Sequence, residues 1–283
     1  MQTISRVSSL GEQVRAWRRQ GEIIALVPTM GNLHAGHLGL VKEARRRAQR
    51  VVVSLFVNPL QFGPSEDFSA YPRTVEEDAA NLKALDVDLL FMPSVADMYP
   101  LPIQSMTYVE VPVLSDDLCG KFRPGHFRGV ATVVMKLFGL TQPDLALFGE
   151  KDFQQLMVIR RMAADLNLPI SILGVPTVRE DDGLAMSSRN SYLSPDERKK
   201  AGQLYAQLRR VAELLGQGRR DFARIEADCS RNLERAGFAV DYVAIRRRED
   251  LSLPETGDSA LVALVAARLG GARLIDNLMV DLD

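Results

Sequence analysis

A short apolar run that leads into two closely spaced histidines constrains this chain more than any other segment. Ile23 to Val27 is typical of a buried parallel strand, and apolar residues recur at helical spacing between Leu38 and Arg50. His34 and His37 therefore fall where a helix begins, and where free amide N–H groups and the positive end of the helix dipole converge. Gly36 lets a ligand approach the backbone, and both imidazoles can donate hydrogen bonds to phosphate oxygens. The segment predicts a site for triphosphate chemistry.

The same two histidines admit two plainer interpretations. They could be half of a metal site, but the chain has only three His and two Cys, with Cys119 and Cys229 far apart in sequence. They could also be ordinary polar residues of a strand-to-helix turn, and the segment alone leaves that alternative open. The two separated cysteines fit a reducing compartment, in which we expect them to be inert packing residues.

Alternating strand-like and helix-like segments over residues 1–175 predict a doubly wound parallel sheet, an α/β fold of Rossmann-like type. Such sheets bind ligands outside the carboxyl ends of their strands, so residues 34–37, 58–62 and 149–152 are the informative ones. Besides Ile23 to Val27, the expected strands are Val51 to Val57, Asp88 to Met92, Asp144 to Phe148 and Ile170 to Val175, and the expected helices are Val75 to Leu85, Val130 to Leu140 and Phe153 to Leu166.

Residues 176–283 predict a second, smaller α+β domain. A helix should open at Ser194 and close at Gly216, and another should run from Asp221 to Ala236. Three strands should follow, at Val240 to Ile245, Ala260 to Ala266 and Ala272 to Asn277, the last two joined by a turn at Gly270-Gly271. We expect this domain to cover the active site, since clefts between domains are common ligand sites.

The segment Met186-Ser187-Ser188-Arg189 lies in a glycine-led loop ahead of the next expected helix. It offers hydroxyl, backbone and guanidinium donors within four residues, and such donors can close over a polyphosphate. A loop of this composition is most often only a connector. Its occurrence after a His-x-Gly-His segment, in that order along one α/β chain, makes the combination specific.

The charge and hydropathy of the chain exclude several classes of partner. A net charge of −1 argues against a broad surface for nucleic acid or acidic membranes. We find neither an apolar run of the length of a membrane span nor the apolar core of a signal peptide. A cytoplasmic protein is therefore the expectation.

These motifs resemble those of the pantothenate synthetase family, the pantoate-β-alanine ligases of the nucleotidyltransferase superfamily. His34-Ala35-Gly36-His37 is similar to the superfamily signature, and Met186 to Arg189 is similar to the family's second phosphate-binding loop. The more restrictive similarities are Pro28 to Gly31, Phe56 to Phe62, Arg123 to Val130 and Phe148 to Gln155. The resemblance extends from about residue 23 to residue 195 and is much less distinctive in the C-terminal domain.

The resemblance implies an ATP-dependent condensation of (R)-pantoate with β-alanine through a pantoyl adenylate, releasing AMP and pyrophosphate. His37 would be the principal catalytic residue, in its neutral form at a helix N-terminus, with His34, Lys151, Ser187, Ser188 and Arg189 supplying further donors. The implied ATP contacts are Met30, Gly31, Asn32, Leu33, His34, Ala35, Gly36, His37, Gly149, Glu150, Lys151, Asp152, Val178, Met186, Ser187, Ser188 and Arg189.

Gln61 and Gln155 match the family's pantoate-binding glutamines, and Gln61 also its β-alanine site. Asn58, Arg123 and His126 are further possible substrate contacts, although Arg123 could equally be a structural ion-pair partner. ATP should arrive with Mg²⁺, which prefers phosphate oxygens and water, so we expect no dedicated metal ligand and no tightly bound organic cofactor. The resemblance also implies a homodimer, with small molecules rather than nucleic acid or membrane as partners.

Three other functions remain to be weighed. A plain nucleotidyltransferase shares the His-x-Gly-His loop but leaves the glutamine-bearing motifs unexplained. An enzyme similar to the aminoacyl-tRNA synthetases would need a basic surface or an added domain for tRNA, and neither is evident. A non-enzymatic nucleotide sensor is disfavoured by Lys151 and Arg189, which accompany both histidines.

Overall fold

The computed structural model describes residues 1–64 and 66–282 of the chain. They divide into two compact units, which we describe separately. The first comprises Met1–Glu150 and Gln155–Pro176, and the second comprises Lys151–Gln154 and the chain from Thr177 onward. The four residues that follow Glu150 therefore belong to the second unit, although the residues on both sides of them belong to the first.

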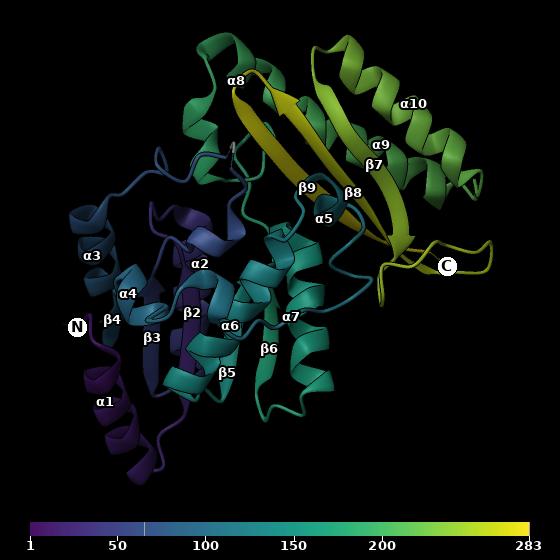
Figure 1. The fold of residues 1–283 in the computed structure, drawn as a ribbon. Coiled ribbons are helices and arrows are strands. Elements are labelled where there is room, and N and C mark those ends of the chain that lie inside the picture. Colours follow the sequence, from purple (N-terminus) through teal and green to yellow (C-terminus); the bar gives the residue numbers. More distant parts are fainter. Residues whose placement is uncertain (65, 283) are drawn as a thin grey trace. The chain divides into compact units, whose positions relative to one another are not determined.

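The first unit contains a six-stranded parallel sheet (Figure 1), which confirms the predicted α/β class. The strand order is β1-β4-β3-β2-β5-β6. The strands are β1 (Gln2–Ile4), β2 (Ile24–Thr29), β3 (Arg50–Leu55), β4 (Leu89–Phe91), β5 (Leu145–Gly149) and β6 (Ser171–Val175). The α-helices are α1 (Val7–Arg19), α2 (Ala35–Arg47), α3 (Val75–Ala84), α4 (Val95–Met98), α5 (Cys119–Phe122), α6 (His126–Thr141) and α7 (Phe153–Asp165).

Helices cover both faces of this sheet because its central strands are apolar on both sides. β2 is buried along almost its whole length, as expected for a strand between two helical layers. Helices α2 and α3 pack on one face, where Val27, Val53 and Leu147 meet Val41 and Leu82 in one core cluster. Helices α1 and α6 contact each other, and α6 also contacts β2.

The strand order reverses direction between β2 and β5, which are hydrogen-bonded neighbours. The chain proceeds from β2 to β3 and β4 on one side, and from β5 to β6 on the other (Figure 1). In open parallel sheets, a ligand binds beyond the carboxyl ends of the strands at such a reversal. The loop and helix start after β2, with His34 and His37, and the end of β5 with the following residue, Gly149 and Glu150, lie at this point of the sheet.

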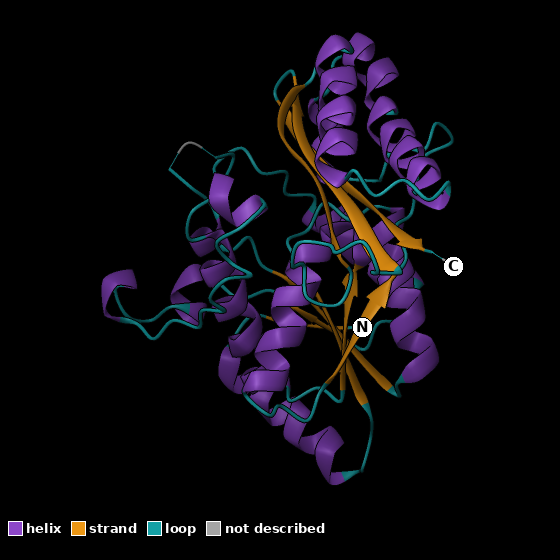
Figure 2. Ribbon diagram, turned by 90° about the vertical axis from the view of Figure 1, so that its right-hand side faces the viewer, coloured by secondary structure: helices purple, strands orange, loops and turns teal. Residues whose placement is uncertain are grey.

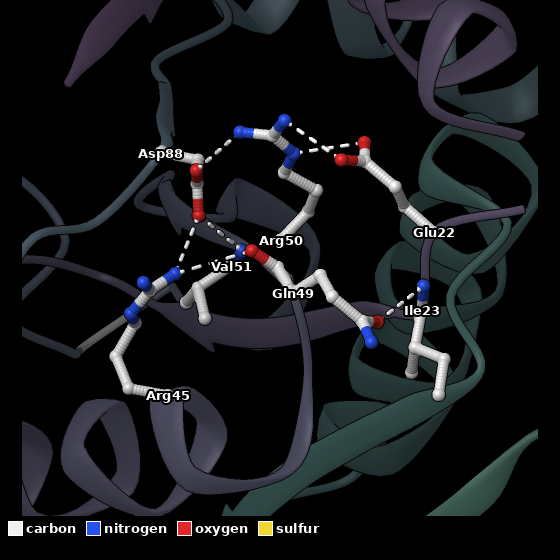
Figure 3. A network of polar contacts seen from close by, with 7 residues as sticks. All are labelled: Glu22, Ile23, Arg45, Gln49, Arg50, Val51 and Asp88. Atoms are coloured by element: carbon white, nitrogen blue, oxygen red, sulfur yellow. Dashed lines mark hydrogen bonds and ion pairs between the residues drawn. The ribbon is translucent and has the colours of Figure 1, made fainter. Parts of the chain in front are cut away.

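A polar network holds the opposite, amino ends of the central strands together (Figure 3). Arg50, the first residue of β3, donates to both carboxylate oxygens of Glu22 at 2.8 Å and to Asp88 at 2.9 Å. Asp88 also accepts from the Arg45 side chain and from the Val51 backbone N–H. Each charged side chain in the network bonds to a group of opposite charge or to a backbone N–H. The network therefore fixes the register of the strands at the end away from the candidate site.

The second unit has an antiparallel sheet in the order β7-β8-β9, formed by β7 (Ala239–Arg247), β8 (Ala260–Leu269) and β9 (Ala272–Asp281). Its α-helices are α8 (Pro195–Ala201), α9 (Gln203–Gly216) and α10 (Phe222–Arg235). Helices α9 and α10 pack against each other and against the sheet, and Figure 2 shows the pair beside the strands. The smaller α+β organisation expected for the C-terminal part is therefore confirmed.

Several expected elements differ from those in the structure. The helix expected from Ser194 to Gly216 is two helices, with Gly202 between them, where a Cβ would be 2.9 Å from the Asp182 carbonyl oxygen. Helix α2 begins three residues before Leu38, so His34 is its N-cap residue and His37 lies in its first turn. The sequence analysis also missed β1 and α1.

No helix within residues 1–64 and 66–282 is long and apolar enough to span a membrane. The two cysteines are buried and neither is in a disulfide, as expected for packing residues, and burial raises the pKa of the Cys229 thiol to about 12.

Candidate active site

The two histidines cap helix α2 through their own side chains. His34 is the N-cap residue, and its Nδ1 atom accepts from the Gly36 N–H at 3.2 Å. The Nδ1 atom of His37 accepts from the His34 N–H at 3.3 Å. A neutral imidazole that accepts at Nδ1 carries its proton on Nε2. Both rings, 4.0 Å apart between centroids, are therefore set to donate through Nε2.

Gly36 is required by this arrangement because its neighbour is a folded-back imidazole. A Cβ at position 36 would lie 2.9 Å from Cε1 of His34, closer than such contacts occur. An alanine there would displace the His34 ring, and with it the acceptor for a backbone N–H at the start of α2. The glycine of the His-x-Gly-His segment thus serves the histidine geometry as well as ligand access.

A buried carboxylate from helix α3 anchors the loop that leads to these histidines. The Asp78 side chain, in a residue only 1% exposed, accepts from the backbone N–H of Asn32 at 2.9 Å and of Leu33 at 2.8 Å. Gly31 and Asn32 have φ of 89° and 52°, so the backbone of the loop adopts the left-handed conformation at these two residues. Asp78 thereby fixes the backbone of a segment predicted to bind ATP.

Asn58 is a buried hub that orients Gln61. Its Nδ2 donates to Oε1 of Gln61 and to the Gly129 carbonyl oxygen, each at 3.1 Å. Its Oδ1 accepts from the Leu60 N–H at 3.2 Å and from the Tyr99 hydroxyl at 2.8 Å. These four bonds match the full hydrogen-bonding capacity of an amide side chain. Asn58, expected as a possible substrate contact, is thus engaged within the protein.

Gly129 allows helix α6 to approach the short 3₁₀ helix η1 (Pro59–Gln61) that carries Gln61. A Cβ at position 129 would lie 2.3 Å from the carbonyl oxygen of Leu60. Only a glycine permits this approach, and it brings the Gly129 carbonyl within reach of Asn58. The Nε2 of Gln61 in turn donates to the sulfur of Met30 at 3.1 Å.

The side chains of Arg123 and His126 bond to the backbone of Gln61. Both donate to the Gln61 carbonyl oxygen, Arg123 through Nη2 at 3.2 Å and His126 through Nδ1 at 2.8 Å. Arg123 also forms two bonds to Glu66, at 2.7 and 2.6 Å. Burial alone would raise the pKa of Glu66, but the bonds and charge of Arg123 prevail and lower it to about 2. The ion-pair role left open for Arg123 is therefore present in the structure.

Gly149, Glu150 and Gln155 lie at or after the end of strand β5. Gly149 is its last residue, Glu150 begins the 3₁₀ helix η3 (Glu150–Asp152), and Gln155 is in the first turn of α7. Strands β3, β2 and β5 are successive neighbours in the sheet. Gln61, the two histidines and Gln155 therefore follow the carboxyl ends of three adjacent strands, as the sequence predicted.

In the second unit, Lys151 is held by its backbone and surrounded by charges. Its carbonyl oxygen accepts from Nδ2 of Asn277 at 2.8 Å. Loss of hydration lowers the pKa of its ammonium group; Asp152 and Asp276 oppose this shift, whereas Arg189 and Arg179 reinforce it. Lys151 thus lies close to Arg189, a residue of the second predicted phosphate-binding segment.

That segment follows a narrow hairpin. Arg179 and Ala185 form an antiparallel bridge, and the Met186 N–H donates to the Val178 carbonyl oxygen at 3.0 Å. Ser187 then caps the 3₁₀ helix η4 (Ser188–Tyr192), its Oγ accepting from the Arg189 N–H at 3.2 Å. Val178 and Met186 to Arg189 are therefore parts of one local structure within this unit.

Four side chains that organise these segments were not found by sequence reasoning. They are the buried residues Asp78, Tyr99, Asp276 and Asn277. Asp78, Tyr99 and Asn277 bond to expected site residues, whereas Asp276 bonds to Arg179 and acts on Lys151 through its charge. The sequence carries one usable signal, the polar pair Asp276-Asn277 between the apolar residues Ile275 and Leu278 of one strand.

Comparison with known proteins identifies what the chain is similar to. The family model described as Pantoate-beta-alanine ligase matches residues 2–279. A protein of Methylococcus capsulatus named Pantothenate synthetase is 59% identical over 283 residues, covering 100% of this chain and 99% of its own. The crystal structure of a pantothenate synthetase from Thermus thermophilus matches with a TM-score of 0.91 at 49% identity, over 98% of this chain and 99% of that one.

A further solved structure was determined with ligands. It is the pantoate-beta-alanine ligase of Francisella tularensis, described as complexed with Beta-gamma ATP and β-alanine. It matches with a TM-score of 0.84 at 33% identity, over 99% of this chain and 97% of that one.

Proposed function

The chain belongs to the pantoate-β-alanine ligase family, and from this membership we propose how its residues divide the work of the reaction. The protein is an enzyme, a ligase that makes pantothenate from pantoate and β-alanine, with ATP as a substrate. The roles of individual residues, the adenylate intermediate, Mg²⁺ and the assembly state are our proposals. The observation that best supports these proposals is the pair of capping bonds made by His34 and His37, at the point where the strand order of the sheet reverses.

We propose two chemical steps. A carboxylate oxygen of pantoate attacks the α-phosphorus of ATP, and the bond from that phosphorus to the bridging oxygen breaks to release pyrophosphate. The amine of β-alanine then attacks the acyl carbon of pantoyl adenylate, loses a proton and expels AMP. Attack of one anion on another requires donors that strengthen as charge develops on the phosphate, and no nucleophile from the enzyme is needed.

His37 and His34 supply such donors in the first step. Each ring accepts a backbone N–H at Nδ1, which leaves its proton on Nε2. The position of both rings at the N-terminus of α2 favours the neutral imidazole. A neutral ring fixed in this way donates without having to reorient as the transition state forms. We assign His37 the larger share, following the family resemblance of the motif.

Lys151, Ser187, Ser188 and Arg189 supply the remaining donors to the phosphates. Together with residues 30–37 and 149–152, Val178 and Met186, they form the proposed ATP-binding set. The positive end of the α2 dipole also favours the phosphates. Mg²⁺ would enter bound to the phosphates of ATP, as part of the substrate.

Gln61 and Gln155 would bind pantoate, and Gln61 would also contact β-alanine. An amide side chain can donate to a carboxylate and accept from a hydroxyl at once, which suits a small hydroxy acid. The bonds described above give Asn58, Arg123 and His126 the supporting role of fixing Gln61. We further propose a homodimer that acts in the cytoplasm and needs no tightly bound organic cofactor.

The proposal is tested by product analysis with ATP, pantoate and β-alanine supplied together and singly. We expect pantothenate and AMP in equal amounts only when all three are present. ADP in place of AMP would contradict the adenylate route. Light scattering of the purified protein tests the dimer, and a monomeric mass at micromolar concentration would contradict it.

A further inference from the structure

Strand β9 carries two adjacent buried polar residues where its neighbours are apolar. Asp276 and Asn277 are 3% and 5% exposed, in a strand that also buries Leu274 and Val280. Burying a carboxylate and an amide is costly unless each finds partners, so their partners show what they hold in place. Neither residue is in the first turn of a helix or in a segment that the family motifs single out.

The partner of Asp276 is Arg179, at the base of the hairpin before Ser187. Arg179 donates to the two carboxylate oxygens of Asp276 at 2.6 and 3.0 Å. It also donates to the carbonyl oxygens of Gly183 at 3.0 Å and Asn277 at 3.2 Å. Its guanidinium carbon lies 3.7 Å from the centroid of the Tyr205 ring. One side chain therefore ties both arms of the hairpin to the final strand.

Tyr205 explains why the hairpin tip is a glycine. Gly183 has φ of 88°, and a Cβ there would lie 2.5 Å from Cδ1 of Tyr205. The hairpin is thus packed against Tyr205 on one side and bonded through Arg179 to Asp276 on the other. Its path, and the starting point of the Ser187 to Arg189 segment, are set from outside the segment itself.

The partner of Asn277 is the Lys151 backbone. Asn277 donates through Nδ2 to the Lys151 carbonyl oxygen at 2.8 Å, and its N–H donates to Oδ1 of Asp276 at 2.8 Å. Asp276 is also one of the two carboxylates that act on the Lys151 ammonium. Consecutive residues on one strand therefore reach the two phosphate-binding elements of this unit.

We propose that Asp276 and Asn277 are positioning residues for ATP, which hold Lys151 and the segment Ser187 to Arg189 in one fixed arrangement. The inference rests on the proposed ATP-binding role of those segments. Neither residue needs to touch the nucleotide. A buried bidentate arginine-carboxylate pair is geometrically specific. It adds little to the net stability of the fold, and its main effect is to allow a single arrangement of the segments that it joins.

The control is a second, partly buried ion pair in the same sheet. Arg273 on β9 donates to Asp241 on β7 at 2.8 Å, with side-chain exposures of 13% and 15%. Asp241→Asn therefore makes the same carboxylate-to-amide change in another arginine pair, at a side chain that is 15% exposed against 1% for Asp276. Asp276→Asn and Asn277→Ala are the test variants, and Asn277→Ala changes no charge, so it remains informative if Asp276→Asn folds poorly.

The experiment measures the Kd of ATP by calorimetry for the full-length wild type and the three variants, at a temperature below every melting transition. We expect Asp276→Asn to weaken ATP by about tenfold or more and Asn277→Ala by about threefold or more, the scale of one or two displaced phosphate contacts. Asp241→Asn should remain within about twofold of the wild type even where its Tm falls. In turnover assays, the KM for ATP should rise in the test variants while that for pantoate changes little.

Equal ATP affinities for Asp276→Asn, Asn277→Ala and Asp241→Asn would overturn the inference, because the pair would then be no more than a stabilising contact. Binding needs no chemistry, so the ranking is independent of turnover. A wild type that binds ATP but makes no pantothenate would contradict the proposed function and leave the ranking valid as a test.

Discussion

The Nδ2 atom of Asn58 donates to the Oε1 atom of Gln61, 3.1 Å away. This bond leaves the Gln61 amide in one orientation, with its Nε2 toward the sulfur of Met30. Since Asn58 is itself held by the hydroxyl of Tyr99 and the carbonyl of Gly129, the orientation of Gln61 is determined by residues that lie far from it in sequence. Substrate binding by Gln61 should therefore depend on Tyr99.

Tyr99→Phe tests this dependence with the smallest change. The variant removes one buried hydrogen bond to Asn58, which should lower the free energy of unfolding by about 1 kcal/mol. It should also raise the KM for pantoate or β-alanine by about three- to tenfold, with the KM for ATP little altered. Steady-state kinetics and urea denaturation measure both effects, and a loss of stability with unchanged KM values would refute the link.

His37→Ala should remove one transition-state donor without disturbing the sheet. We expect the rate of adenylate formation to fall by about 10²- to 10³-fold, the usual loss for one such donor. His37 is partly exposed in the first turn of α2, so the fold should persist. Single-turnover kinetics give the rate and circular dichroism the fold; near-normal turnover would remove the role assigned to His37.

Gln155→Ala should act on pantoate rather than on ATP. Its position in the first turn of α7, after the strand next to β2, is consistent with a neighbour of the acid that is activated. We expect the KM for pantoate to rise by about tenfold or more while that for ATP stays within about twofold. The reverse pattern would mean that pantoate binds elsewhere.

Glu66→Gln should make the protein less stable at neutral pH but hardly less stable in strong acid. The folded chain lowers the pKa of Glu66 from 4.5 to about 2, so its ionised form stabilises the fold. That stabilisation is complete above the unfolded pKa and is lost as the pH falls toward the folded one. The difference in unfolding free energy between wild type and variant should therefore shrink from about pH 6 to about pH 2. A difference that is independent of pH in urea titrations would exclude the ion pair with Arg123 as its cause.

Much of the fold could be predicted because its determinants are local. Apolar runs such as Val51 to Leu55 are buried on both sides and can hardly be anything but central strands. The expectation that ligands bind where such strands end then led to His34, Gln61 and Gly149. Helix α1 was also within reach, since Leu10, Val14 and Trp17 have helical spacing and are buried.

The supporting residues of the site could not be predicted because their partners are remote in sequence. Asp78 bonds to backbone 45 and 46 residues away, and Asn277 to a carbonyl 126 residues away. No spacing rule connects such pairs, and an Asp in the first turn of α3 is expected there for the helix dipole alone.

Pantoate-dependent exchange of labelled pyrophosphate into ATP, measured without β-alanine, tests the proposed adenylate most directly. The two-step account predicts exchange that requires pantoate, that is lost in His37→Ala, and that gives way to AMP and pantothenate when β-alanine is added. An active enzyme that shows no exchange until β-alanine is present would contradict a free-standing pantoyl adenylate and the role given to the histidine cap.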